Sequence, residues 1–207
     1  RVAGIRPVYF DLRFGNLCNL KCIMCHPASS SKWYEDYAKI WNTDHFHDSG
    51  YKIHIGNSAA SYYKWYESES FWVDLETRIG EMRQVYLVGG EPLIIQQHYD
   101  FLRLCVERGV AGNITLEYDT ILTKFKEEHI PLWRAFKKII LRVSLDDHGA
   151  QNEYIRFPSK WNHIENNLKK LKTDLPNLVL SYSTTYQIMN AFTVTNLWRH
   201  RSEERRV

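Results

Sequence analysis

Five short runs of the chain alternate apolar and polar residues with the two-residue period of a β-strand, and helix-like runs separate most of them. The predicted strands are residues 8–15, 84–90, 113–119, 139–146 and 178–187. The predicted helices are residues 94–108, 122–137 and 158–173, with a shorter helical stretch at 190–199. Strands that alternate with helices are typical of parallel βα units rather than of hairpins.

Most of the predicted strands have one polar face and one largely apolar face. The polar positions are Tyr9, Asp11 and Arg13; Thr115, Glu117 and Asp119; Arg142, Ser144 and Asp146; and Ser181, Ser183, Thr185 and Gln187. An antiparallel sheet with one solvated face would show the same alternation. The intervening helices disfavour it, because they must cover the apolar face and leave the polar face lining an interior. We therefore expect an α/β fold, a partial (β/α) barrel whose polar lumen binds ligands.

Residues 42–70 interrupt this pattern with histidine, serine and aromatic side chains. His45 and His47 could bind a metal, but two histidines spaced by two residues in a loop are a weak signal. A surface insertion is the favoured interpretation of this segment.

Length and composition favour one domain over residues 1–207, since 207 residues with 44% hydrophobic content suffice for one core or most of one barrel. A formal net charge of +3 gives no electrostatic footprint for nucleic acid. There is no apolar run of about 18 residues and no apolar signal segment at the start of the sequence. We expect a cytoplasmic protein with neither a membrane nor a nucleic acid as partner.

Three of the 4 cysteines, Cys18, Cys22 and Cys25, lie in the single stretch "CNLKCIMC". In a reducing compartment, such clustering favours metal or redox chemistry over disulfides. Cys105 is alone in the apolar pattern "YDFLRLCVERG", which predicts a small buried hydrophobic residue.

Four interpretations of the cysteine loop can be compared. "CIMCH" has the form of a c-type haem attachment site, which belongs to exported proteins. A thioredoxin-like dithiol needs only Cys22 and Cys25 and leaves Cys18 unexplained. Structural zinc needs a further ligand, and His26 is poorly placed because it adjoins Cys25. An iron–sulfur cube usually has a cysteine on every iron, so three thiolates leave one iron open to a small molecule.

"CNLKCIMC" resembles the C-x3-C-x-Φ-C signature of radical S-adenosylmethionine (radical SAM) enzymes, with Met24 at the Φ position. "YLVGGEP", residues 86–92, ends the second predicted strand and resembles the GGE motif of that family. In the family, the backbone and carboxylate of this motif receive the methionine ammonium, which would involve Gly89, Gly90 and Glu91. Glycine suits a position where the backbone must approach a ligand closely.

Two later segments extend the resemblance. "RVSLDD" is similar to the fourth strand of the family and implies that Ser144 and Asp146 lie near the ribose hydroxyls. "EYIRFPSKW" is similar to the next segment and implies that Arg156 binds the cofactor carboxylate as a fork. The wider layout is most similar to the branch of the family that carries SPASM or twitch domains.

The resemblance implies a [4Fe–4S] cluster on Cys18, Cys22 and Cys25, with S-adenosylmethionine on the open iron. An electron from a reduced carrier of the flavodoxin or ferredoxin type would cleave this cofactor to a 5′-deoxyadenosyl radical, which abstracts hydrogen from a substrate. A peptide is the commonest substrate in that branch, and a small molecule is the other option. No catalytic acid or base can be named. The alternative is a non-catalytic zinc or iron–sulfur binding module.

The chain departs from the family pattern in two places. The third strand ends in "EYDTILT" where relatives often have T-N-G or T-N-L, so Asp119 and Thr120 receive no role from that motif. No cysteine follows Cys105, so no auxiliary cluster is expected. The strand pattern ends before the charged tail "RHRSEERRV" with a final strand that has no partner, which predicts a core domain truncated at its C-terminus that self-associates through this edge.

Overall fold

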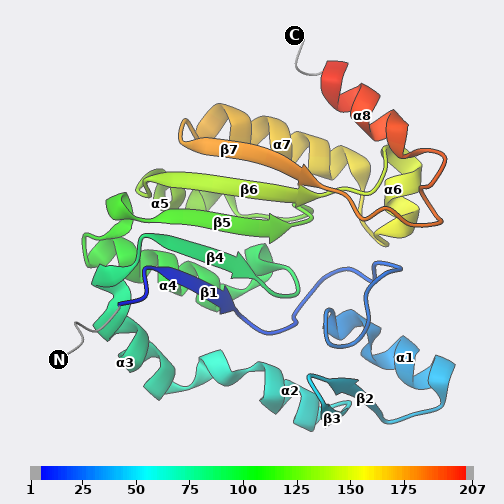
Figure 1. Cartoon of the computed structure of the whole chain (residues 1–207), viewed down its shortest axis with the longest axis horizontal. Coiled ribbons are helices and arrows are strands. Elements are labelled where there is room, and N and C mark those ends of the chain that lie inside the picture. The colour runs from blue at the N-terminus through cyan, green and yellow to red at the C-terminus, as the bar shows by residue number, and fades with distance from the viewer. Residues whose placement is uncertain (1–5, 204–207) are drawn as a thin grey trace.

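The computed structural model describes residues 6–203 and is built on one sheet of parallel strands (Figure 1). In their order across the sheet, the strands are β1 (Tyr9–Arg13), β4 (Gln84–Val88), β5 (Thr115–Thr120), β6 (Lys138–Ser144) and β7 (Leu178–Ser183). Each strand pairs in parallel with the next, as with Leu12 opposite Leu87 and Val143 opposite Tyr182. The predicted α/β fold, a partial barrel of parallel strands, is confirmed, and every predicted strand is present with ends that differ by a few residues.

Helices α4, α5 and α7 cover one face of the sheet, and the other face is turned toward the viewer in Figure 1. The helices are α1 (Tyr34–Trp41), α2 (Asn57–Tyr63), α3 (Glu69–Arg78), α4 (Gln96–Glu107), α5 (Ile130–Arg134), α6 (Gly149–Ile155), α7 (Trp161–Asp174) and α8 (Val194–Glu203). Helix α6 lies beyond the carboxyl ends of the strands (Figure 1). Within the described residues, none of these helices combines the length and apolar content that crossing a membrane requires.

The core lies between the sheet and the helices that cover it, where the apolar face of the strands packs against the apolar faces of the helices. Helix α7 contributes side chains at positions i, i+4 and i+7, which lie on one helix face. Full burial of one such side chain stabilises the fold by about 1.5–3 kcal/mol. The core residues of the central layer include Leu116, Tyr118, Leu141, Val143, Phe101, Leu102, Ile164, Leu168 and Leu171. Cys105 is fully buried among them, as predicted.

The opposite face of the central strands carries a polar network. Arg142 Nε donates to Asp119 Oδ1 at 2.6 Å, and Arg142 Nη1 lies 3.4 Å from Glu117 Oε2. The same guanidinium lies over the Tyr86 ring at 4.9 Å. The predicted polar face is therefore confirmed at the centre of the sheet.

The predicted helix at 122–137 is wrong over its first half. Residues 121–126 are not helical, and helix α5 begins only at Ile130, after a short 3-10 turn over 127–129. Leu122 has a left-handed backbone, with a φ of 56°, and its N–H donates to Thr120 Oγ1 at 2.9 Å. Helices α1, α2, α3 and α6 were not predicted.

The segment 42–70 forms an antiparallel hairpin, β2 (His45–Asp48) and β3 (Tyr51–His54), followed by helix α2. It has its own small apolar cluster around Phe46 and Ile53. His45 lies opposite His54 in the hairpin, and His45 Nδ1 is 2.9 Å from Asp44 Oδ1.

Candidate functional site

The cysteine loop follows β1 at the carboxyl edge of the sheet and presents three free thiols. Cys18 and Cys22 are buried, and Cys25 is half-buried. The Leu20 N–H points at Cys18 Sγ at 3.4 Å, and the Trp33 indole donates to the Cys22 carbonyl at 3.1 Å. Hydrogen bonds hold the loop, and its three thiols stay free of disulfides.

A distant segment closes on this loop through its backbone. The Lys21 N–H donates to the Phe157 carbonyl at 2.6 Å, and the Ile23 N–H donates to the Ile155 carbonyl at 2.8 Å. These two bonds flank Cys22 on one segment and Arg156 on the other. The structure thus brings Arg156 beside the cysteines, although nothing in the sequence spacing relates the two segments.

The glycines of the GGE motif let the β4 turn pack on the cysteine loop. A Cβ on Gly90 would lie 2.2 Å from the Leu17 carbonyl oxygen, and one on Gly89 would lie 2.7 Å from the Gly15 oxygen. The Gly90 N–H donates to the Gly15 carbonyl at 3.2 Å. Glycine is therefore required here by the approach of two backbone segments, in addition to any approach of a ligand.

Glu91, the third residue of that motif, is fully buried and satisfied within the protein. Its Oε1 accepts from the Thr120 hydroxyl at 2.6 Å and from the Leu93 N–H at 3.2 Å. Its Oε2 accepts from the Ile121 N–H at 2.9 Å. Thr120, which received no role in the sequence analysis, therefore joins β5 to the GGE turn together with the Ile121 N–H. Its one signal in the sequence was a polar side chain on the apolar face of the strand.

Asp146 and Arg156 form a buried pair at the end of β6. Arg156 Nη2 donates to Asp146 Oδ1 at 2.9 Å, and Nε lies 2.8 Å from Oδ2. The side chains are 0% and 8% exposed, respectively. Asp146 Oδ1 also accepts from the Thr185 N–H at 2.9 Å, which holds the segment after β7.

The other predicted cofactor residues lie close to these segments. Ser144 is half-buried and is the last residue of β6. Met24 is half-buried and packs against the core. Contact of these residues, or of Glu91, Asp146 and Arg156, with a cofactor stays a prediction.

Burial and one cation set the acidity of the thiols. Burial raises the pKa of Cys18 to about 11. The pKa of Cys25 falls to about 7, chiefly because its sulfur accepts a hydrogen bond from Cys22, and the Arg156 charge acts in the same direction. The pKa of Cys22 is raised by the same hydrogen bond and by burial, while Arg156 opposes the rise. Arg156 is thus the cation that favours thiolates at two of the three cysteines.

The Arg156 charge also acts on the pKa of Glu91. Burial raises the pKa of its carboxyl group, and its hydrogen bonds and the Arg156 charge oppose that rise. The site therefore combines three soft thiol donors, one buried cation and two buried carboxyl groups at a single end of the sheet. Soft thiolates are the ligands of iron–sulfur clusters and zinc, so the donor set fits a thiolate-bound metal centre. In the described part of the chain, no three His, Cys, Asp or Glu side chains converge on a position for one metal ion.

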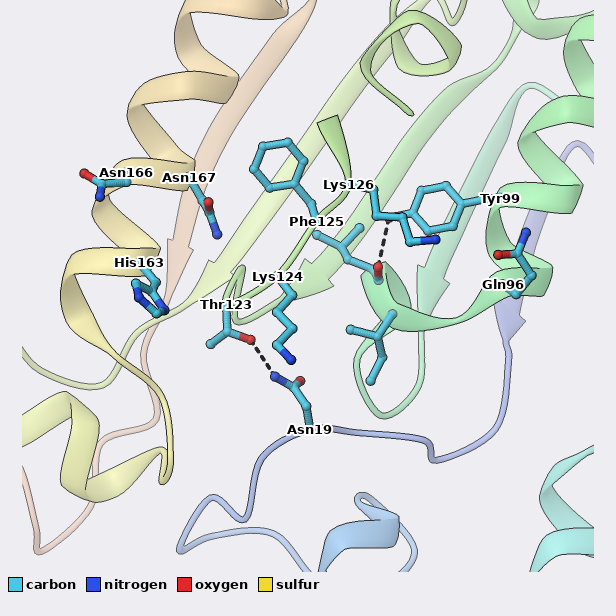
Figure 2. A pocket seen from close by; sticks show the side chains of 12 residues that line it. Asn19, Gln96, Tyr99, Thr123, Lys124, Phe125, Lys126, His163, Asn166 and Asn167 are labelled. Carbon is cyan, nitrogen blue, oxygen red and sulfur yellow. Dashed lines mark hydrogen bonds between the residues drawn. The ribbon is translucent and has the colours of Figure 1, made fainter. Parts of the chain in front are cut away.

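Among the hollows that adjoin the cysteine loop, two large ones lie on different sides of it. The first, of about 590 Å³, lies between the loop, the ends of β1 and β4, and the 42–70 segment. Its lining includes Arg13, His26, Asp48, Tyr62, Tyr63, Trp65 and Gly89. The second, of about 660 Å³, lies between the loop, the segment after β5 and helix α7 (Figure 2).

Comparison with known proteins identifies the fold. No family model and no curated protein matches the sequence. Among solved structures, the chain is similar to native anSMEcpe with bound AdoMet, with a TM-score of 0.64 and 15% identity over 96% of this chain and 49% of that one. It is also similar to Streptococcus suis SuiB, with a TM-score of 0.57 and 14% identity over 97% of this chain and 38% of that one.

A further structure is SuiB bound to precursor peptide SuiA, with a TM-score of 0.56 and 15% identity over 97% of this chain and 38% of that one. The chain spans about half or less of the length of these solved chains. At such low identity, the likeness concerns the fold. The chain therefore has an α/β fold of the radical SAM type, a partial barrel of parallel strands with the cysteine loop at its carboxyl edge.

Proposed function

We propose that the chain is a radical SAM enzyme that holds a [4Fe–4S] cluster through Cys18, Cys22 and Cys25 and binds S-adenosylmethionine beside it. The observation that carries this proposal is the position of the three free thiols. They lie on the one loop that closes over both the GGE turn and Arg156, at the carboxyl edge of the sheet. In parallel α/β folds, that edge is where ligands bind.

The surrounding residues have separate parts in this proposal. The Gly89–Gly90 turn supplies backbone groups at the loop, and Glu91 acts as a positioning residue because its carboxylate already holds Thr120 and Ile121. Arg156, fixed by Asp146, supplies positive charge beside Cys22 and Cys25 and is the donor for a cofactor carboxylate. Met24 and Ser144 complete the proposed cofactor contacts.

When bound and reduced by one electron, the cluster supplies reductive cleavage of S-adenosylmethionine to methionine and a 5′-deoxyadenosyl radical, which takes hydrogen from a substrate. The hollow beside Gly89 is the proposed substrate site. Its wall comes from Tyr62 and Tyr63 of the 42–70 segment, and Arg13 and Asp48 contribute polar groups. A peptide substrate is proposed, supported by the SuiB structure that holds a precursor peptide.

The test is the metal content of protein reconstituted anaerobically with iron and sulfide. We expect about four irons and about four sulfides per chain, and loss of this cluster in Cys22→Ala. Cys105→Ala is the matched control, since Cys105 is also a buried free thiol but lies in the core. A full cluster in Cys22→Ala would contradict the proposal, and one zinc per chain in the parent would favour a non-catalytic binding module.

A further inference from the structure

The hollow beside helix α7 continues into a second one along the outer side of the cysteine loop. The two have volumes of about 660 Å³ and about 370 Å³ and share four lining residues. The shared residues are Asn19, Thr123, Lys124 and His163. We call the joined surface the lysine groove, because Lys32, Lys124, Lys126 and Lys160 line it. Figure 2 shows Lys124 and Lys126 on the segment after β5, with Asn19 below them and His163 on α7.

The cysteine loop forms one wall of the lysine groove. Asn19 and Leu20, which lie between Cys18 and Cys22 in the sequence, both line it. Asn19 Nδ2 donates to Thr123 Oγ1 at 2.9 Å, which joins the loop to the segment after β5. The groove shares no lining residue with the hollow beside Gly89. It therefore adjoins the cysteine loop on a side separate from the proposed substrate site.

The groove exists because the segment after β5 is not helical. Leu122 turns with a positive φ, and the following residues place Lys124 and Lys126 in solvent. The floor beneath them is apolar, with Leu93, Ile94, Tyr99 and Phe125 in the lining. An apolar floor with a cationic rim is a surface suited to a partner whose own rim is acidic.

The charge of the rim is incompletely neutralised by the protein. Among the described residues, neither Lys32 nor Lys124 forms an ion pair, and both are exposed. Lys160 pairs with Glu153 at 3.1 Å, and Lys126 lies 3.7 Å from Glu128. The two unpaired lysines are in the parts of the groove that adjoin Asn19 and Leu20.

We infer that the lysine groove is the docking surface for an acidic one-electron carrier protein. This inference rests on the proposed function. In the transfer, the reduced carrier loses one electron and the cluster on the cysteine loop gains it. The carrier must come close to that loop, and the groove gives it access at the half-buried Asn19. Electron-transfer complexes have small interfaces. Complementary charge raises their association rate more than their affinity.

The first test measures binding of oxidised flavodoxin, an acidic carrier, to the reconstituted protein by calorimetry. We expect binding that weakens as salt rises, and an affinity lower on the order of tenfold in Lys32→Glu/Lys124→Glu. Lys137→Glu/Lys138→Glu is the matched control. These exposed lysines lie at the amino end of β6, away from the carboxyl edge that holds the cysteine loop, and they have no ion pair among the described residues. Equal affinity in the two charge-reversed proteins would overturn the inference, as would binding that salt does not affect.

The second test measures the rate of cluster reduction, followed by its absorbance. Reduced flavodoxin should reduce Lys32→Glu/Lys124→Glu on the order of ten times more slowly than the parent, while dithionite should reduce both at the same rate. An unchanged rate with flavodoxin would refute the docking surface and leave the proposed function intact, provided that dithionite still drives cofactor cleavage. A parent protein that holds no cluster would instead refute the proposed function.

Discussion

Two of the places where the described residues bury polar side chains differ in charge. At the carboxyl edge of the sheet, Glu91, Asp146 and Arg156 lie beneath the cysteine loop. Between α4, β5 and α5, His98 and Tyr118 form a neutral cluster. In it, His98 Nε2 is hydrogen-bonded to the Tyr118 hydroxyl at 2.7 Å, and the Trp133 indole donates to the same oxygen at 3.1 Å.

The neutral cluster is buried without any charge, whereas the charged cluster carries the desolvation cost of an ion pair. Burial lowers the pKa of His98 to about 3 and raises the pKa of Tyr118, so both stay uncharged at neutral pH. Burying an ion pair costs several kcal/mol of desolvation per ion, which its attraction offsets only with good geometry. The chain accepts that cost where Arg156 faces Cys22 and Cys25, a place that needs a fixed cation. It accepts the cost again at the buried Arg201, which lies 3.4 Å from Glu165.

The largest predicted effect comes from breaking the charged pair. Asp146→Ala leaves the Arg156 guanidinium buried without its carboxylate and frees the Thr185 N–H. We expect a loss of about 4 kcal/mol in the free energy of unfolding, measured by urea denaturation of the metal-free protein.

A double variant separates unpaired charge from lost packing. Asp146→Leu/Arg156→Met removes both charges and keeps apolar volume, so it should be less destabilised than Asp146→Ala. If the double variant is the less stable of the two, the pair stabilises the fold directly and its charge does not mark the site.

The second prediction concerns the neutral cluster. Tyr118→Phe removes the hydroxyl and leaves two buried groups, His98 Nε2 and Trp133 Nε1, without this partner. Each orphaned group costs about 1–3 kcal/mol, so we expect a loss of about 3 kcal/mol in the same denaturation experiment. Cluster assembly should be unaffected, because Tyr118 lies away from the cysteine loop. A Tyr118→Phe protein that folds normally but takes up no iron would break the division between the two clusters.

Sequence patterns predicted the regular parts of the fold and failed where tertiary contacts override local preference. The strand alternation found β5 and β6 because one face of each packs on the core. The helix at 122–137 was wrong because Glu91 binds the Ile121 N–H and the Thr120 hydroxyl binds the Leu122 N–H. These bonds hold the chain in a turn that no local residue requires.

The motifs of the candidate site were predicted from the sequence, but the contacts that bring them together were not. The spacing of Cys18, Cys22 and Cys25 and the Gly89–Gly90 pair were visible as motifs. The pairing of Asp146 with Arg156 could not be predicted, since it depends on the backbone closure of residues 21–23 onto 155–157. The lysine groove was equally hidden, because its lysines come from separate segments that only the fold brings together.

The smallest predicted effect is the pH dependence of stability that His98 contributes from the neutral cluster. The pKa of His98 is about 3 in the folded protein against an ordinary value of 6.5, because burial disfavours the charged ring. Between these values the unfolded chain binds the extra proton, so the His98 contribution to stability is complete above pH 6.5 and declines as pH falls. Going from about pH 7.5 to about pH 5, the parent should lose about 2 kcal/mol more than His98→Gln in urea denaturation. His129 and His148, whose pKa values burial also lowers, are present in both proteins, so their contribution cancels in the difference. Parallel pH profiles for parent and variant would mean that the folded protein does not lower the pKa of His98, and that the two buried clusters do not differ in charge as we describe.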